Sequence, residues 1–185
     1  RPFLADPHWV AKAAAGRADA INTCIACNQA CLDHTFTGRR ATCLVNPRAG
    51  YERTLRITPV ARPRRLAVVG AGPAGLAAAS TAAERGHQVD LFEAGPAIGG
   101  QFLLAARVPG KEEYAQTVRY YASRLAETGV RVYLGSLVDA DRLIAGDYDE
   151  VILATGVHPR TPQVPGIDHP RVVSYAQLLS GERTA

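Results

Sequence analysis

A glycine-rich stretch in the middle of the chain constrains its fold more than any other feature. Residues 66–79 read LAVVGAGPAGLAAA, which predicts a buried strand, a tight turn and the start of a helix. We expect Gly70 to form the turn, Gly72 to let a pyrophosphate approach the backbone, and Gly75 to let the helix pack closely on the strand. Together these features are typical of a dinucleotide-binding unit.

The residues around this turn support the same interpretation. The helix begins at Pro73 and Ala74, and its N-terminal N–H groups and partial positive charge would face the phosphates. A second strand at 87–93 ends in Glu93, about 20 residues after the glycines, where a carboxylate accepts hydrogen bonds from ribose hydroxyls. Glu93 suits the ribose of FAD or of NAD and argues against a 2′-phosphate. The alternative is an ordinary acidic residue at a strand end.

The rest of the chain alternates helices and strands. Helices are predicted at 6–16 (with Asp6 as N-cap), 73–85, 111–128 and after Ser174, and further strands at 130–134 and 148–156. The last strand carries four consecutive apolar residues, which predicts burial on both faces. This order predicts an α/β fold with a doubly wound, parallel, Rossmann-like sheet, preceded by a small segment that holds all the cysteines.

Composition narrows the class of protein. The 185 residues carry a formal net charge of +4, and no apolar run reaches the roughly 18 residues of a membrane span. We find no signal peptide, and a nucleotide-binding fold favours the cytoplasm. The chain contains no Met, so we expect an internal piece of a longer polypeptide. Arginines concentrate in 39–65, but only Tyr51 there can stack on a base, so we expect no nucleic-acid partner.

The four cysteines form the second constraining pattern. Cys24, Cys27, Cys31 and Cys43 follow the spacing C-x2-C-x3-C-x11-C. Disulfides are disfavoured because nothing marks the chain as secreted. Zinc usually takes two separate C-x2-C pairs, whereas an iron–sulfur cluster accepts three closely spaced cysteines and one remote cysteine. The spacing therefore favours an iron–sulfur cluster and leaves zinc as an alternative.

Four stretches carry a resemblance to a known family. They are RPFLADP at 1–7, INTCIACNQACLD at 21–33 with CLVNPR at 43–48, the glycine turn with GGQF at 99–102, and LATGV at 153–157. In these stretches the chain resembles an internal segment of NADPH-dependent 2,4-dienoyl-CoA reductases, old-yellow-enzyme-like oxidoreductases with FMN, FAD and an iron–sulfur cluster. Related amine dehydrogenases begin their cysteine motif C-x2-C-x2-C, so the extra residue here favours the dienoyl-CoA branch.

The resemblance implies a role for particular residues. The four cysteines would ligate a [4Fe–4S] cluster, and Arg1 resembles a barrel arginine that contacts the FMN phosphate. The positions implied for FAD are Gly70, Gly72, Pro73, Ala74, Gly75, Glu93, Gly100, Gln101, Arg107, Val138, Ala154, Thr155 and Gly156. Among them, Val138 would meet the adenine through its backbone, and Thr155 and Gly156 would close over the pyrophosphate. No residue shows the pattern of an acid–base catalyst.

The resemblance also implies a domain organisation. Residues 1–20 would end a barrel domain, 21–64 would form the iron–sulfur loop and a linker, and 65–185 would form an incomplete FAD-binding domain. Electrons would pass from NADPH through FAD and the cluster to FMN, with NADPH, FMN and the small-molecule substrate held by other domains of the same polypeptide. The fragment alone would not reduce a substrate. The alternatives are a related enone or amine oxidoreductase and a zinc-stabilised, non-catalytic nucleotide-binding module.

Overall fold

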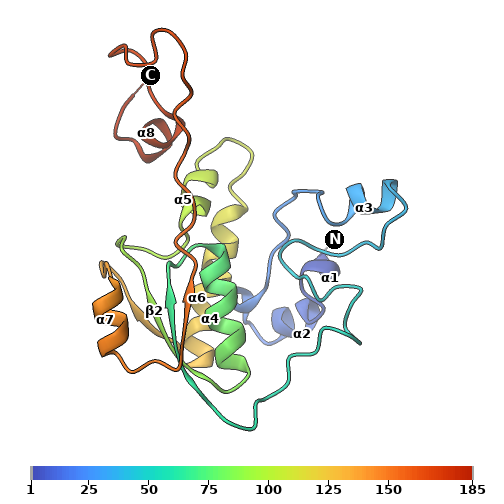
Figure 1. Ribbon diagram of the computed structural model, residues 1–185. Helices are drawn as coiled ribbons and strands as arrows, with labels where there is room; N and C mark the ends of the chain where they lie inside the picture. Colours follow the sequence, from blue (N-terminus) through green and yellow to red (C-terminus); the bar gives the residue numbers. More distant parts are fainter. Residues whose placement is uncertain (1, 185) are drawn as a thin grey trace.

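A four-stranded parallel sheet forms the centre of the molecule (Figure 1). The computed structural model describes residues 2–184. Its strands are β1 (Arg65–Val69), β2 (Gln88–Phe92), β3 (Arg131–Tyr133) and β4 (Glu150–Leu153). They lie in the order β3-β2-β1-β4, and every neighbouring pair is parallel. The predicted α/β fold with a parallel sheet is confirmed.

Two long helices pack together on one face of this sheet. They are α4 (Pro73–Glu84) and α6 (Tyr114–Thr128), and α6 begins three residues later than the sequence predicts. Alternate residues of β1 and β2 point to this face because side chains along a strand alternate between its two sides. The core that results consists of Leu66, Val68, Ala71, Leu76, Ala79, Val89, Leu91, Leu125 and Val130.

The opposite face of the sheet is only partly covered. The short helix α7 (Ala140–Ala145) lies over β2 and β3 there, and the Asp139 side chain caps its N-terminus. The prediction that the last strand is buried on both faces is wrong, because Val151 is 41% exposed and Leu153 is 73% exposed. β4 lies at the sheet edge, and only its Ile152 side packs on the core, so half of its apolar run faces outward.

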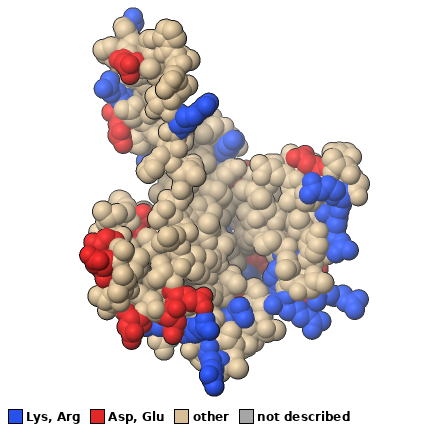
Figure 2. Space-filling view, viewed as in Figure 1, with Lys and Arg blue, Asp and Glu red and all other residues tan. Residues whose placement is uncertain are grey.

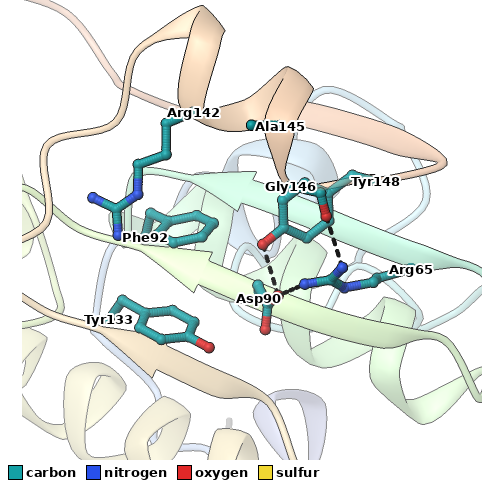
Figure 3. Close-up of a pocket in the computed structure, with 8 residues that line it drawn as sticks. All are labelled: Arg65, Asp90, Phe92, Tyr133, Arg142, Ala145, Gly146 and Tyr148. Atoms are coloured by element: carbon teal, nitrogen blue, oxygen red, sulfur yellow. Dashed lines mark hydrogen bonds and ion pairs between the residues drawn. The ribbon is translucent and has the colours of Figure 1, made fainter.

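A buried carboxylate organises this second face (Figure 3). Asp90 of β2 is 1% exposed and lies at the base of a cavity of about 270 Å³ under α7. Its oxygens accept hydrogen bonds from Arg131 (2.6 and 3.0 Å), from the Tyr148 hydroxyl (2.7 Å) and from Arg65 (3.3 Å). Asp90 therefore joins β1, β2, β3 and the residues that lead into β4.

The N-terminal part packs beside α6 and carries the cysteines (Figure 1). It contains α1 (Pro2–Ala5), α2 (Trp9–Ala14), the 3-10 turn η1 (Ala18–Ala20) and α3 (Leu32–Phe36), of which only α2 was predicted. The prediction that Asp6 caps the first helix is wrong, since α2 begins after His8. The Asp6 carboxylate is instead drawn into the interior by Lys12 and by the backbone N–H of Asn22.

Side-chain contacts hold η1 against α6. Ser123 donates a 3.2 Å hydrogen bond to Asp19, and Arg119 donates to the carbonyl oxygen of Ala18. Arg17 forms an ion pair with Glu127. These contacts fix the cysteine-bearing part beside the helix that covers the sheet.

Residues 44–64 connect the two parts without a helix or strand, as predicted. Figure 2 shows lysine and arginine side chains gathered on the cysteine-bearing side and most acidic side chains near α7 and the sheet. Part of this basic charge supports the connection itself, since Arg40 lies 4.9 Å from the Tyr51 ring and Arg48 donates to the Leu55 carbonyl at 3.1 Å.

The C-terminal residues extend away from the sheet toward α8 (Tyr175–Ser180) (Figure 1). Ser174 caps α8, as predicted, in a reciprocal capping box with Gln177. The short helix α5 (Gln101–Ala105) was not predicted. Among residues 2–184, no helix has the length and apolar character needed to cross a bilayer.

We predict that Asp90→Ala lowers the free energy of unfolding by about 3 kcal/mol, because it removes the shared acceptor of two guanidinium groups and a phenol. Urea unfolding followed by circular dichroism measures this change. Asp141→Ala, on the exposed side of α7, is the matched control and is expected within about 0.5 kcal/mol of the unaltered chain. Equal loss in both variants would contradict a structural role for Asp90.

Candidate functional site

The turn after β1 brings three backbone segments into contact. Gly70 has φ of +99°, and a Cβ there would overlap the carbonyl oxygen of Ala154. A Cβ at Gly75 would overlap the carbonyl oxygen of Gly70. The structure therefore assigns both glycines the packing roles expected from the sequence: Gly70 turns the chain against the end of β4, and Gly75 seats α4 on the turn.

Gly72 differs from these two glycines because it faces open space. It is the N-cap of α4, and a Cβ built on it would meet no atom within 4 Å. The first N–H groups of α4, a helix of 12 residues, point into this space without partners in the helix and favour a negatively charged group. An open backbone at the start of α4 fits the approach of a phosphate.

A second glycine loop lies against the first. The Gly99 N–H donates a 2.8 Å hydrogen bond to the Ala71 carbonyl, and a Cβ at Gly100 would lie 3.0 Å from the Gly72 Cα. Gly100 has φ of +53° and leads directly into α5. The two loops therefore form one glycine-lined cradle at the carboxyl ends of β1 and β2.

Glu93 lies at the edge of this cradle. Its carboxylate accepts hydrogen bonds from the N–H groups of Ala71 (2.7 Å) and Gly95 (2.8 Å). The loop after β3 reaches the same edge, because Ser136 donates its N–H to the Glu93 carbonyl at 2.8 Å. Val138 lies in this loop, two residues further on. The strand-end acid and the residue expected near an adenine thus occupy one side of the cradle.

The loop after β4 closes the other side. Ala154 donates its N–H to the Val69 carbonyl at 2.8 Å, so it continues the β1–β4 pairing into the cradle. Gln101 at the start of α5 donates to the Val157 carbonyl at 3.1 Å. Thr155 and Gly156, which are exposed, lie in the short stretch between these two attachments.

One of the sequence-predicted positions, Arg107, stands apart from the cradle's contacts. Arg107 directs its guanidinium to the last carbonyls of α8, with 2.8 Å hydrogen bonds to Leu179 and Ser180. There it compensates the negative end of the helix. Arg1 lies outside the described residues. Sequence reasoning missed the backbone N–H groups of Ala71 and Gly95 that orient Glu93, and the repeated glycines around Glu93 were the only signal for them.

The cysteines lie in two backbone segments that approach each other. All four thiols are free and half-buried. Thr42 donates its N–H to the Ala30 carbonyl at 2.7 Å, which pairs the residue before Cys43 with the residue before Cys31. The pKa of the Cys43 thiol lies above its usual value, chiefly because the thiol is partly buried. The N–H groups of Val45 and Asn46 offset part of this rise. The Thr42–Ala30 hydrogen bond thus brings the Cys43 segment beside the segment of the first three cysteines.

The donor chemistry of this segment fits a thiolate-bound metal or cluster. Ala26 donates its N–H toward the Cys24 sulfur at 3.4 Å, and Ala26 and Asn28 adopt φ of +53° and +60°. Hydrogen bonds of this kind stabilise thiolates at iron–sulfur sites. Among residues 2–184, however, no three His, Cys, Asp or Glu side chains already lie close enough together to hold a metal ion. The loop supplies the ligand types without a closed ligand sphere.

The fold and the cradle define a nucleotide-binding unit of the kind found in flavin-dependent oxidoreductases. Residues 64–182 match the family described as pyridine nucleotide-disulphide oxidoreductase, and the chain belongs to this family. That membership agrees with the nucleotide-binding unit that the glycine turn and the parallel sheet define.

Relatives extend the match over the cysteine-bearing part. The chain is 36% identical over 189 residues to the metal reductase of Desulforamulus reducens, and the alignment covers 100% of this chain and 28% of that protein. It superposes on a 2-naphthoyl-CoA reductase complex with a TM-score of 0.95 and 37% identity, over 100% of this chain and 28% of the other. Histamine dehydrogenase from Rhizobium sp. 4-9 gives a TM-score of 0.80 and 32% identity, over 89% and 24%. The chain thus spans about 28% of the length of such relatives.

We predict that Gly75→Ala lowers the free energy of unfolding by about 3 kcal/mol, because its Cβ must displace the Gly70 carbonyl. Chemical denaturation measures the loss. Ala74→Ser adds one atom at the neighbouring exposed position and is expected within about 0.5 kcal/mol of the unaltered chain. A Gly75→Ala variant as stable as Ala74→Ser would show that α4 does not need this close approach.

Proposed function

We propose that the chain is the FAD- and [4Fe–4S]-holding segment of an NADPH-dependent oxidoreductase similar to 2,4-dienoyl-CoA reductase. The observation that carries this proposal is the packing of a four-thiol segment directly beside the helix layer of a nucleotide cradle. A nucleotide-binding unit alone needs no such segment. Two redox groups held by one short chain allow electrons to move between them.

The cradle residues would hold the ADP half of FAD. The open backbone at Gly72 and the N-terminus of α4 favour the pyrophosphate. Glu93 would exchange its bonds to Ala71 and Gly95 for bonds to the ribose hydroxyls, because those N–H groups already orient the carboxylate toward the cradle. Bound FAD would supply hydride-accepting chemistry, while this chain's residues fix its orientation and charge environment.

The cysteine segment would close around a cluster. Cys24, Cys27 and Cys43 lie on the two segments that the Thr42–Ala30 hydrogen bond brings together, so a bound cation would offset the repulsion between their thiolates. Backbone N–H groups near Cys24 and Cys43 would stabilise the thiolates. A bound [4Fe–4S] cluster would supply one-electron transfer, which suits a chain placed between NADPH as the two-electron donor and FMN elsewhere in the longer protein.

The substrate class depends on parts of the polypeptide beyond this chain. The C-x2-C-x3-C spacing supports an unsaturated CoA thioester, and the TM-score with a CoA-ester reductase supports it as well. An amine or enone substrate is the second candidate, favoured by the similarity to histamine dehydrogenase. A zinc-stabilised module without redox chemistry is the third. We propose a cytoplasmic location and no nucleic-acid or membrane partner.

Anaerobic reconstitution tests the proposal. We expect the purified chain, treated with ferrous iron and sulfide, to bind about four irons, turn brown and bleach with dithionite. Added FAD should co-purify and be released on denaturation. A colourless chain that binds one zinc in place of iron would contradict the electron-transfer function and support the zinc-stabilised module.

We predict that Gly72→Ala weakens FAD binding at least about tenfold without a change in folding stability, since its Cβ meets only the space assigned to the pyrophosphate. Flavin fluorescence titration and thermal unfolding measure the two quantities. Gly75→Ala serves as the contrast, because it should lose stability as well as FAD. Unchanged FAD affinity in Gly72→Ala would place the phosphates elsewhere.

A further inference from the structure

We propose that the buried carboxylate of Asp6 is the positioning residue that sets the two cysteine-bearing segments relative to each other and to α6. This inference rests on the proposed function, because it concerns the thiols proposed to hold the cluster. Asp6 lies 18 residues before the first of those cysteines in the sequence. Its side chain is 3% exposed, although a carboxylate in a short N-terminal segment would ordinarily face water.

Within residues 2–184, three groups donate hydrogen bonds to the Asp6 carboxylate. Lys12 donates its ammonium at 2.6 Å, and His8 and Asn22 donate their backbone N–H groups at 2.9 Å each. Burial alone would raise the pKa of Asp6, but these hydrogen bonds outweigh it and hold the pKa below its usual range. The carboxylate is therefore ionised at neutral pH and serves as the common acceptor for α2 with its N-cap and for the stretch that contains Asn22.

Asn22 extends this network to both cysteine segments. Asn22 stands two residues before Cys24, and its backbone N–H donates a hydrogen bond to Asp6. Its side-chain amide donates a 2.7 Å hydrogen bond to the Val45 carbonyl, two residues after Cys43. Asn22 is 7% exposed, so water competes little for these bonds. A single buried residue thus bridges the segment of the first three cysteines and the turn of the fourth.

A second tie holds the Cys43 turn to the N-terminal segment. Asn46 donates its side-chain amide to the Leu4 carbonyl at 2.9 Å, and it forms an antiparallel bridge with Cys43. Leu4 lies two residues before Asp6. The Cys43 turn is therefore attached on one side through Asn22 and on the other through Leu4, and both attachments converge on the chain around Asp6.

Lys12 connects the same carboxylate to the nucleotide-binding part. Besides Asp6, its ammonium donates to the Ala20 carbonyl at 2.8 Å, at the end of η1. It also lies 5.7 Å from the centre of the Tyr120 ring on α6. The network therefore runs from α6 through Lys12, Asp6 and Asn22 to the Cys43 turn. Asp6 therefore acts on the positions of α6 and the Cys43 turn, and not only on the short helix next to it.

Asp6→Asn tests the inference, because it keeps the size of the side chain but turns an NH2 group toward donors that need an acceptor. We compare the 185-residue chain and this variant after anaerobic reconstitution with ferrous iron and sulfide. We expect release of iron to a chelator to be about tenfold faster in the variant, with altered EPR g-values of the dithionite-reduced cluster. FAD affinity should stay within about twofold, because the cradle does not contact Asp6.

Asn22→Ala provides a second variant that leaves Asp6 and Lys12 intact and removes only the link to Val45. We expect the same direction of change in iron release and EPR spectrum. Asp141→Asn is the matched control, since it removes one negative charge from an exposed position on α7, away from the cysteines. It should behave like the unaltered chain.

The outcomes separate the inference from the function on which it rests. If the unaltered chain assembles a cluster and both variants match it in iron release and EPR spectrum, Asp6 is not a positioning residue and the proposed function stands. A lower melting temperature with an unchanged spectrum at full iron content would likewise reduce Asp6 to a purely structural role. If the unaltered chain takes up no iron, the proposed cluster fails and this inference fails with it.

Discussion

The close approach of α4 to the turn after β1 is the constraint on which the rest of the structure depends. Gly75 lets the helix rest on the Gly70 carbonyl, and Gly70 lets the turn rest on the end of β4. Because these contacts leave no room for a side chain, they fix where α4 begins. The position of its N-terminus, in turn, creates the open space beside Gly72 in which a phosphate fits.

Two buried carboxylates then attach the peripheral parts to this centre. On the sheet face away from α4, Asp90 accepts hydrogen bonds from Arg65 and Tyr148 (Figure 3) and also from Arg131. Asp6 gathers Lys12 and Asn22 between α6 and the cysteine turns. Both side chains are nearly inaccessible, so each requires compensating donors.

Much of the centre could be predicted from the sequence, because its signals are local. The glycine spacing, the strand ending in Glu93 and the capping Ser174 each indicate structure within a few residues. The exposure of β4 could not be predicted, because an apolar run does not reveal whether a neighbouring strand or helix covers it. Asp6 looked like a helix cap for a related reason: its partners Lys12 and Asn22 are polar residues with no recognisable spacing, and only the folded chain brings them together.

The exposed position of β4 has a consequence for how this chain behaves on its own. Within residues 2–184, β4 is an outer strand of the sheet, and Val151 and Leu153 add apolar surface beside that edge. A parallel edge strand offers a row of backbone donors and acceptors to any extended segment that meets it. We therefore expect the isolated chain to self-associate along this edge as its concentration rises.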